Sequence, residues 1–144
     1  MGVALSAEDR LDILDLYADY SARFDHGDAE GWADLFAPDG RFTITGERAL
    51  QGPDELSDFA RSMFVYRGMR HHVSNIRATA CVGGARSSAY VLVLRTDRRQ
   101  RLRLLNAGDY DDELVRVGER WVFGLRTFTR WIPQELADGL LLQR

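Results

Sequence analysis

The sequence predicts an α+β domain, a cone-shaped roll in which a curved antiparallel sheet wraps around three N-terminal helices. Two observations support this fold. Helical periodicity and capping signals are concentrated before about residue 66, whereas residues 70–131 are rich in β-branched and aromatic side chains separated by turn signals. The chain of 144 residues contains no internal repeat or linker, so we expect one domain over residues 1–144.

The first helix is expected to run from about Ser6 to Phe24. Ser6 is followed three residues later by Asp9, which resembles a capping box with aspartate in place of the usual glutamate. Leucine, isoleucine and aromatic residues then recur at helical spacing. This pattern predicts a helix with one apolar face that packs on the sheet.

Shorter elements are expected before residue 70. In chain order they are a second helix over 29–36 after the N-cap Asp28, a turn over 37–40 (Ala-Pro-Asp-Gly), a strand over 41–45 that Gly46 ends, and a third helix from Gly52-Pro53 to about Tyr66.

Four long strands are expected to complete the fold, over residues 70–82, 86–97, 101–117 and 120–131. Glycine pairs or polar residues separate them, as is typical of hairpin turns. A meander of this kind, closed on one side by helices, leaves a cone with one open mouth. Such a cone is a natural pocket for a small molecule.

The composition excludes several kinds of chemistry. All 19 basic residues are arginine, which rules out Schiff-base catalysis, a lysine general base and a P-loop lysine. The net charge of −3 argues against a nucleic-acid partner. Apolar runs are too short to span a bilayer and the N-terminus turns acidic early, so we expect no membrane partner and a cytoplasmic location. The lone Cys81 excludes a multi-cysteine metal site.

Asp25 lies where the first helix is expected to end. Tyr17, Ser21 and Asp25 are spaced four residues apart and so lie along one face of that helix, which also carries apolar residues such as Phe24. An aspartate in this position is either a solvated residue at the helix end or a buried carboxylate that faces the cone.

Two adjacent histidines begin the first long strand. Alternation places His71, Val73 and Asn75 on one face and His72 on the other, without deciding which face is inside. One interpretation is a core histidine beside a surface histidine. The other is a general base, an imidazole that a carboxylate orients and stabilises when protonated. Adjacent histidines that point in opposite directions are a poor metal site, so we expect no metal.

Several segments carry a family resemblance, in order and over nearly the whole chain: 16–25 (LYADYSARFD), 28–32 (DAEGW), 35–40 (LFAPDG), 70–75 (RHHVSN), 113–116 (ELVR) and 118–121 (GERW). With these segments the sequence resembles the SnoaL-like branch of the nuclear-transport-factor-2-like superfamily. The resemblance implies the cone-shaped fold, on which dehydratases, dehydrohalogenases, isomerases, cyclases and catalytically silent subunits occur.

Within this superfamily, the group of scytalone dehydratase, bile-acid dehydratase and lindane dehydrochlorinase uses an Asp–His pair, which the resemblance places at Asp25 and His71. Tyr20 matches a tyrosine of the bile-acid dehydratase type, and Arg126 a cavity arginine of the dehydrochlorinase type. Tyr20 also stands where the dehydrochlorinase has lysine, which favours an oxygenated substrate. The second tyrosine of scytalone dehydratase falls near Ile44, which argues against that activity. Tyr20 as a core residue and Arg126 as a surface charge are the alternatives.

The expected function is therefore that of a dehydratase-like lyase or isomerase that acts without a cofactor on a small hydrophobic oxygenated ring compound. His71, oriented by Asp25, would remove a proton beside a carbonyl, and Tyr20 or Arg126 would stabilise the oxyanion or assist a departing hydroxyl. Two alternatives are an intramolecular cyclase of a polyketide- or terpenoid-type intermediate and a non-catalytic subunit similar to the β chain of a ring-hydroxylating dioxygenase. The expected substrate contacts are Tyr17, Phe24, Asn75 and Phe128.

Two expectations concern protein partners. The convex face of such a sheet is apolar enough to bind a second copy, which predicts a homodimer or homotrimer. The arginine-rich segment 95–103 is expected to be a solvated hairpin tip. The alternative is that it binds a specific partner, an anionic acyl carrier protein.

Overall fold

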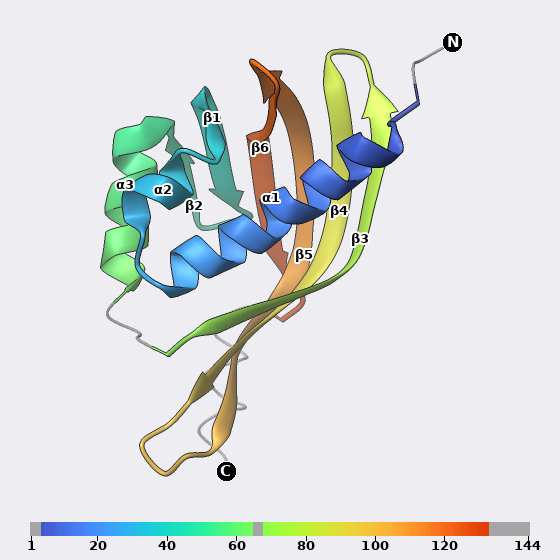
Figure 1. Ribbon diagram of the computed structural model, residues 1–144. Coiled ribbons are helices and arrows are strands. Elements are labelled where there is room, and N and C mark those ends of the chain that lie inside the picture. Colours follow the sequence, from blue (N-terminus) through green and yellow to red (C-terminus); the bar gives the residue numbers. More distant parts are fainter. Residues whose placement is uncertain (1–3, 65–67, 133–144) are drawn as a thin grey trace.

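A computed structural model describes residues 4–64 and 68–132. Its elements, in chain order, are α1 (Ala7–Asp25), α2 (Ala29–Ala33), β1 (Phe36–Ile44), β2 (Arg48–Gln51), α3 (Gly52–Met63), β3 (Arg70–Cys81), β4 (Gly84–Thr96), β5 (Leu102–Val117) and β6 (Arg120–Arg130). The strands form one curved sheet, and α1 crosses its concave face while α2 and α3 cover the end near β1 and β2 (Figure 1).

The strand order in the sheet is β2-β1-β6-β5-β4-β3. Neighbouring strands are antiparallel except β1 and β6, which run parallel. The α+β class with a strongly curved sheet around N-terminal helices is confirmed. The parallel pair and the short edge strand β2 were not expected, because β2 has four largely exposed residues and so carries no alternation of apolar and polar side chains.

The start of α1 follows the predicted capping box. The side chain of Ser6 accepts a hydrogen bond from the backbone N–H of Asp9, and the carboxylate of Asp9 accepts one from the backbone N–H of Ser6, both at 3.0 Å. The helix ends at Asp25, and Gly27, with a φ of +78°, lets the chain turn into α2. The inner face of α1 buries Ile13, Leu16, Tyr17, Tyr20 and Phe24.

The segment after α2 differs from expectation. The helix ends at Ala33 instead of residue 36, and the predicted turn over 37–40 lies inside β1. The pairing of β1 with β6 shifts between Phe36 and Arg41, so the Pro-Asp-Gly residues occupy an irregularity in a strand. Proline lacks the N–H for a regular ladder and is tolerated at such a bulge. Turn-forming residues therefore bend this strand and do not end it.

The remaining boundaries agree closely with the pattern. The turn at Gly46 and the long strands β3 to β6 lie where they were expected, whereas α3 ends at Met63 and residues 65–66 of its expected range lie outside the described part of the chain. The β4–β5 hairpin, with the arginine-rich tip, extends beyond the helices (Figure 1). No helix in the described ranges has both the length and the apolar character needed to cross a bilayer.

Candidate active site

Asp25 and His71 meet in space although 46 positions separate them along the chain. The end of α1 presents Asp25, and the first residues of β3 present His71. One carboxylate oxygen of Asp25 accepts a hydrogen bond from the backbone N–H of His71 at 2.8 Å, and the other lies 2.6 Å from His71 Nδ1. The two side chains are only 4% and 9% exposed. The carboxylate at the helix end is therefore buried and not solvated.

This geometry fixes the orientation of the imidazole. A carboxylate accepts hydrogen bonds, so Nδ1 of the neutral ring donates to Asp25 and the lone pair lies on Nε2. The ring of Phe24 packs edge-on against the imidazole, with 5.3 Å between ring centroids. His71 lines the cavity, whereas His72 is exposed. At the start of β3, the strand face that carries His71 is therefore the inner one. An imidazole held in this way has the geometry that a general base requires.

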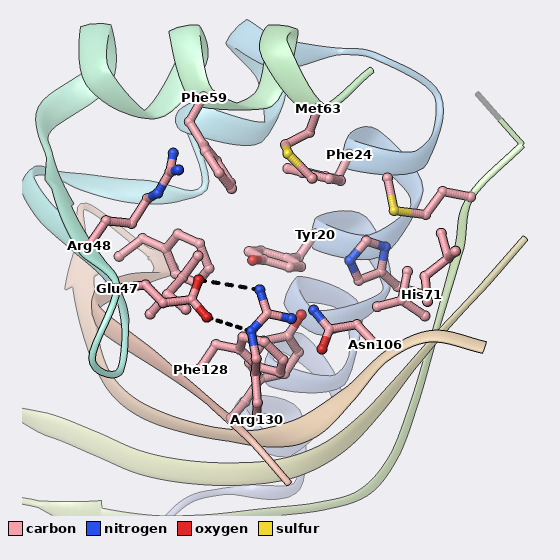
Figure 2. A pocket seen from close by; sticks show the side chains of 16 residues that line it. Tyr20, Phe24, Glu47, Arg48, Phe59, Met63, His71, Asn106, Phe128 and Arg130 are labelled. Carbon is pink, nitrogen blue, oxygen red and sulfur yellow. Dashed lines mark hydrogen bonds and ion pairs between the residues drawn. The ribbon is translucent and has the colours of Figure 1, made fainter. Parts of the chain in front are cut away.

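A cavity of about 420 Å³ opens beside the imidazole (Figure 2). Most of its wall is apolar or aromatic, with a few polar side chains. The lining residues are Tyr20, Phe24, Phe42, Ile44, Glu47, Arg48, Phe59, Met63, Met69, His71, Val93, Leu105, Asn106, Tyr110, Phe128 and Arg130. The size and lining suit a small hydrophobic molecule with one or two polar groups.

Tyr20 and Tyr110 form a neutral polar patch on the cavity wall. Their ring centroids are 5.8 Å apart, and the two rings meet edge to face. Burial raises the pKa of Tyr20, with the charge of Arg126 opposing the shift, and burial likewise carries the pKa of Tyr110 well above its usual value. Both side chains therefore stay protonated phenols near neutral pH, and each keeps a proton that it can donate in a hydrogen bond.

Arg126 does not line the cavity. Its guanidinium is fully buried and forms two hydrogen bonds of 2.8 Å with the carboxylate of Asp112. The faces of Tyr110 and Tyr20 lie 3.8 and 4.2 Å from its central carbon, so the arginine is behind the two tyrosines. Burial alone would lower the pKa of Arg126, but the Asp112 carboxylate raises it. Arg126 was expected to line the cavity. Instead, it lies in the core, where Asp112 neutralises its charge.

Two of the expected substrate contacts, Phe24 and Phe128, line the cavity, and the other two do not. The hydroxyl of Tyr17 donates to buried Asp112 and lies 3.0 Å from Ser87 Oγ, so Tyr17 belongs to the core network. Asn75 is exposed, with a φ of +56°, where the register of β3 against β4 shifts. This bulge breaks the alternation on which its cavity-facing position was predicted.

Sequence reasoning missed the charged residues of the cavity, Glu47, Arg48 and Arg130. Glu47 lies in the turn between β1 and β2, Arg48 begins β2, and Arg130 ends β6. For Arg130 a signal was present, because strand alternation from Phe128 places it on the same face. No signal marked Glu47 and Arg48, since a turn residue carries no periodicity and the four-residue strand that Arg48 begins is too short and too exposed to show any. Among the described residues, no group of three or more histidine, cysteine or acidic side chains is placed to hold a metal.

Comparisons with known proteins agree with this architecture. A protein of unknown function from Nostoc punctiforme is 25% identical with a TM-score of 0.81, over 93% of this chain and 99% of that one. Aln2 from a Streptomyces species is 23% identical with a TM-score of 0.80, over 99% and 100% of the two chains. A proposed scytalone dehydratase from Novosphingobium aromaticivorans is 24% identical with a TM-score of 0.77, over 87% and 85%.

No curated protein matches the sequence significantly. The family model of the SnoaL-like domain, however, matches residues 5–127, which include every element from α1 to most of β6 and both members of the Asp25–His71 pair. This match covers most of the chain, so the chain belongs to the SnoaL-like domain family. Its curved sheet with a helix across the concave face is the NTF2-like, cystatin-like fold of the structural neighbours.

Proposed function

We propose that the protein is a cofactor-independent lyase or isomerase that removes a carbon-bound proton from a small hydrophobic oxygenated ring compound. The observation that carries this proposal is the 2.6 Å contact between Asp25 and His71 Nδ1 at the wall of a 420 Å³ cavity. A solvent-facing histidine would not support it. Dehydratase-like chemistry also fits the proposed scytalone dehydratase among the structural neighbours.

The chemistry begins at His71 Nε2, which accepts a proton from the carbon beside the substrate carbonyl. Asp25 stabilises the imidazolium that forms, and the electron pair of the broken C–H bond develops negative charge on the carbonyl oxygen. The phenols of Tyr20 and Tyr110 are the neutral donors on the cavity wall that are suited to this charge. Their raised pKa values prevent them from competing as bases.

In a dehydration, the electron pair then forms a carbon–carbon double bond as the β C–O bond breaks. The proton held by His71 passes to the departing hydroxyl, so the products are an unsaturated carbonyl compound and water. In an isomerisation, the same proton returns at another carbon. Neither course needs an oxidant, a reductant or a metal, and both use the base that the structure holds in place.

The test is hydrogen exchange at carbon. Wild-type protein is incubated in D₂O with a panel of one- and two-ring β-hydroxy ketones, and deuterium at carbon is followed by NMR and mass spectrometry. We expect His71→Ala to slow exchange by ~10²–10⁴-fold, the contribution of a positioned base. His72→Ala is the matched control, because His72 is its exposed neighbour and should leave the rate unchanged.

The products separate the alternatives. Loss of the mass of water indicates a dehydratase, and an unchanged mass with ring closure indicates a cyclase. Exchange that survives His71→Ala refutes His71 as the base. A wild-type protein that binds these compounds without any exchange supports the non-catalytic binding subunit.

A further inference from the structure

The cavity has a second polar end that the proton-transfer chemistry does not use. Glu47 and Arg48 lie at this end, and Figure 2 shows His71 on the other side with Tyr20 between, while Arg130 reaches Glu47 from the lower part of the view. Apolar and aromatic side chains such as Phe128 make up much of the intervening wall. The charged side chains Glu47, Arg48 and Arg130 are therefore separated from His71 by a wall that is mostly apolar or aromatic, with Tyr20, Tyr110 and Asn106 as its neutral polar groups.

The charges at this end do not cancel. Arg130 forms two hydrogen bonds to the carboxylate of Glu47, at 2.6 and 3.3 Å. The hydrogen bond from Arg130 lowers the pKa of Glu47, and the charges of Arg130 and Arg48 add to this against partial burial, so the carboxylate is ionised at neutral pH. Arg48 makes no hydrogen bond or ion pair within residues 4–64 and 68–132. Among the described charged residues at this end, one positive charge is left over.

The position of Arg48 favours a bound anion. Its guanidinium carbon lies 5.6 Å from the centre of the Phe59 ring, so part of the arginine rests on apolar surface at the mouth of the cavity. A guanidinium presents a planar fork of donors that matches a carboxylate. Arg130, whose side chain is 17% exposed, lines the same cavity and is held there by Glu47.

We propose that the ligand of this cavity carries a carboxylate, which Arg48 binds with the help of Arg130 while the hydrophobic rings occupy the middle. For the substrate, this inference rests on the proposed function, and it places the carboxylate at the far end from the carbon that His71 deprotonates. Glu47 orients Arg130 and competes with the ligand carboxylate for it. The substrate class is thus a hydrophobic oxygenated ring acid.

Binding tests this independently of turnover. The probes are 2-naphthoate and 2-naphthamide, which share one ring system and differ in charge, with affinities measured by isothermal titration calorimetry at low salt. We expect wild-type protein to prefer 2-naphthoate by about tenfold or more, as for a charge-assisted hydrogen bond. Arg48→Gln should reduce this ratio to about threefold or less, whereas Arg41→Gln, an exposed arginine one strand away, should leave it unchanged.

Two further variants sharpen the test. Glu47→Gln should strengthen 2-naphthoate binding, because it removes a competing negative charge, and a purely structural role of Glu47 predicts the reverse. His71→Ala should abolish carbon exchange but keep the preference for 2-naphthoate, so the two proposals fail separately. The inference is overturned if neither probe binds, if both bind equally, or if Arg48→Gln and Arg41→Gln have the same effect.

Discussion

Replacing Asp112 by alanine removes the carboxylate that neutralises the buried guanidinium of Arg126. Both side chains are fully buried, and two hydrogen bonds of 2.8 Å join them. Removing one partner of a buried pair leaves an uncompensated charge and costs about 3–5 kcal/mol. The hydroxyl of Tyr17 also loses its acceptor, which adds about 1 kcal/mol.

Aromatic rings around the guanidinium of Arg126 reduce this loss of stability. The central carbon of the guanidinium lies 3.8 to 4.6 Å from the rings of Tyr110, Phe123, Tyr20 and Tyr17, and these faces continue to attract the cation after the carboxylate is gone. We therefore expect the free energy of unfolding to fall by about 3 kcal/mol, the lower end of the range. With a urea dependence of about 2 kcal/mol/M, the midpoint of unfolding moves down by about 1.5 M.

Urea unfolding followed by circular dichroism measures this shift. Asp111→Ala is the matched control, because Asp111 is the exposed neighbour on the same strand. Asp112→Asn keeps the shape of the side chain and should fall between wild type and Asp112→Ala, which keeps the test available if the alanine variant does not fold. The double variant Arg126→Met/Asp112→Leu should recover at least about 2 kcal/mol of the loss. Equal midpoints for the Asp112 and Asp111 variants, or no recovery in the double variant, would refute the reasoning.

Three further outcomes are expected. Asp25→Asn should slow carbon exchange by ~10²–10⁴-fold, because the amide no longer stabilises protonated His71, whereas Asp15→Asn on the exposed face of α1 should not; equal rates for both would contradict the dyad. The raised pKa values of Tyr17, Tyr20 and Tyr110 mean that the folded state keeps protons that unfolded tyrosine loses above about pH 10. The free energy of unfolding should therefore fall as the pH rises above about 10 and show no contribution from these groups below it, as measured by urea unfolding with phenolate absorbance. Finally, Leu92→Glu, on the exposed side of β4, should shift a homo-oligomer toward monomer in sedimentation, and a monomeric wild-type protein would contradict this.

Local signals predicted the elements well where the interaction is itself local. The Ser6–Asp9 capping box spans three positions, and both of its hydrogen bonds form. The residues 37–40 show the limit of such signals. Proline, aspartate and glycine favour a turn in isolation, but burial of Phe36 in the core and pairing of β1 with β6 hold this segment in a strand.

The candidate site was predictable in part. The family resemblance pointed to Asp25 and His71, and the structure brings the two together. Alternation alone placed Asn75 in the cavity and failed, because a bulge in β3 interrupts the two-residue period. For Arg126 the sequence offered a basic residue on an inward strand face but no sign of its partner, since Asp112 lies on the neighbouring strand and pairs with it only through the β5–β6 register.

By itself, the sequence determined the fold class, the capped start of α1, the hairpin turns between the long strands and the absence of lysine chemistry, because these depend on residue type and short spacing. Only the tertiary structure decided which charges are paired and which face the cavity. Arg126 is neutralised in the core by Asp112, while Arg48 and Arg130 line the cavity together with Glu47, the one carboxylate among its described lining residues. Strand register and sheet curvature set these distances, and both arise from contacts between residues far apart in the chain.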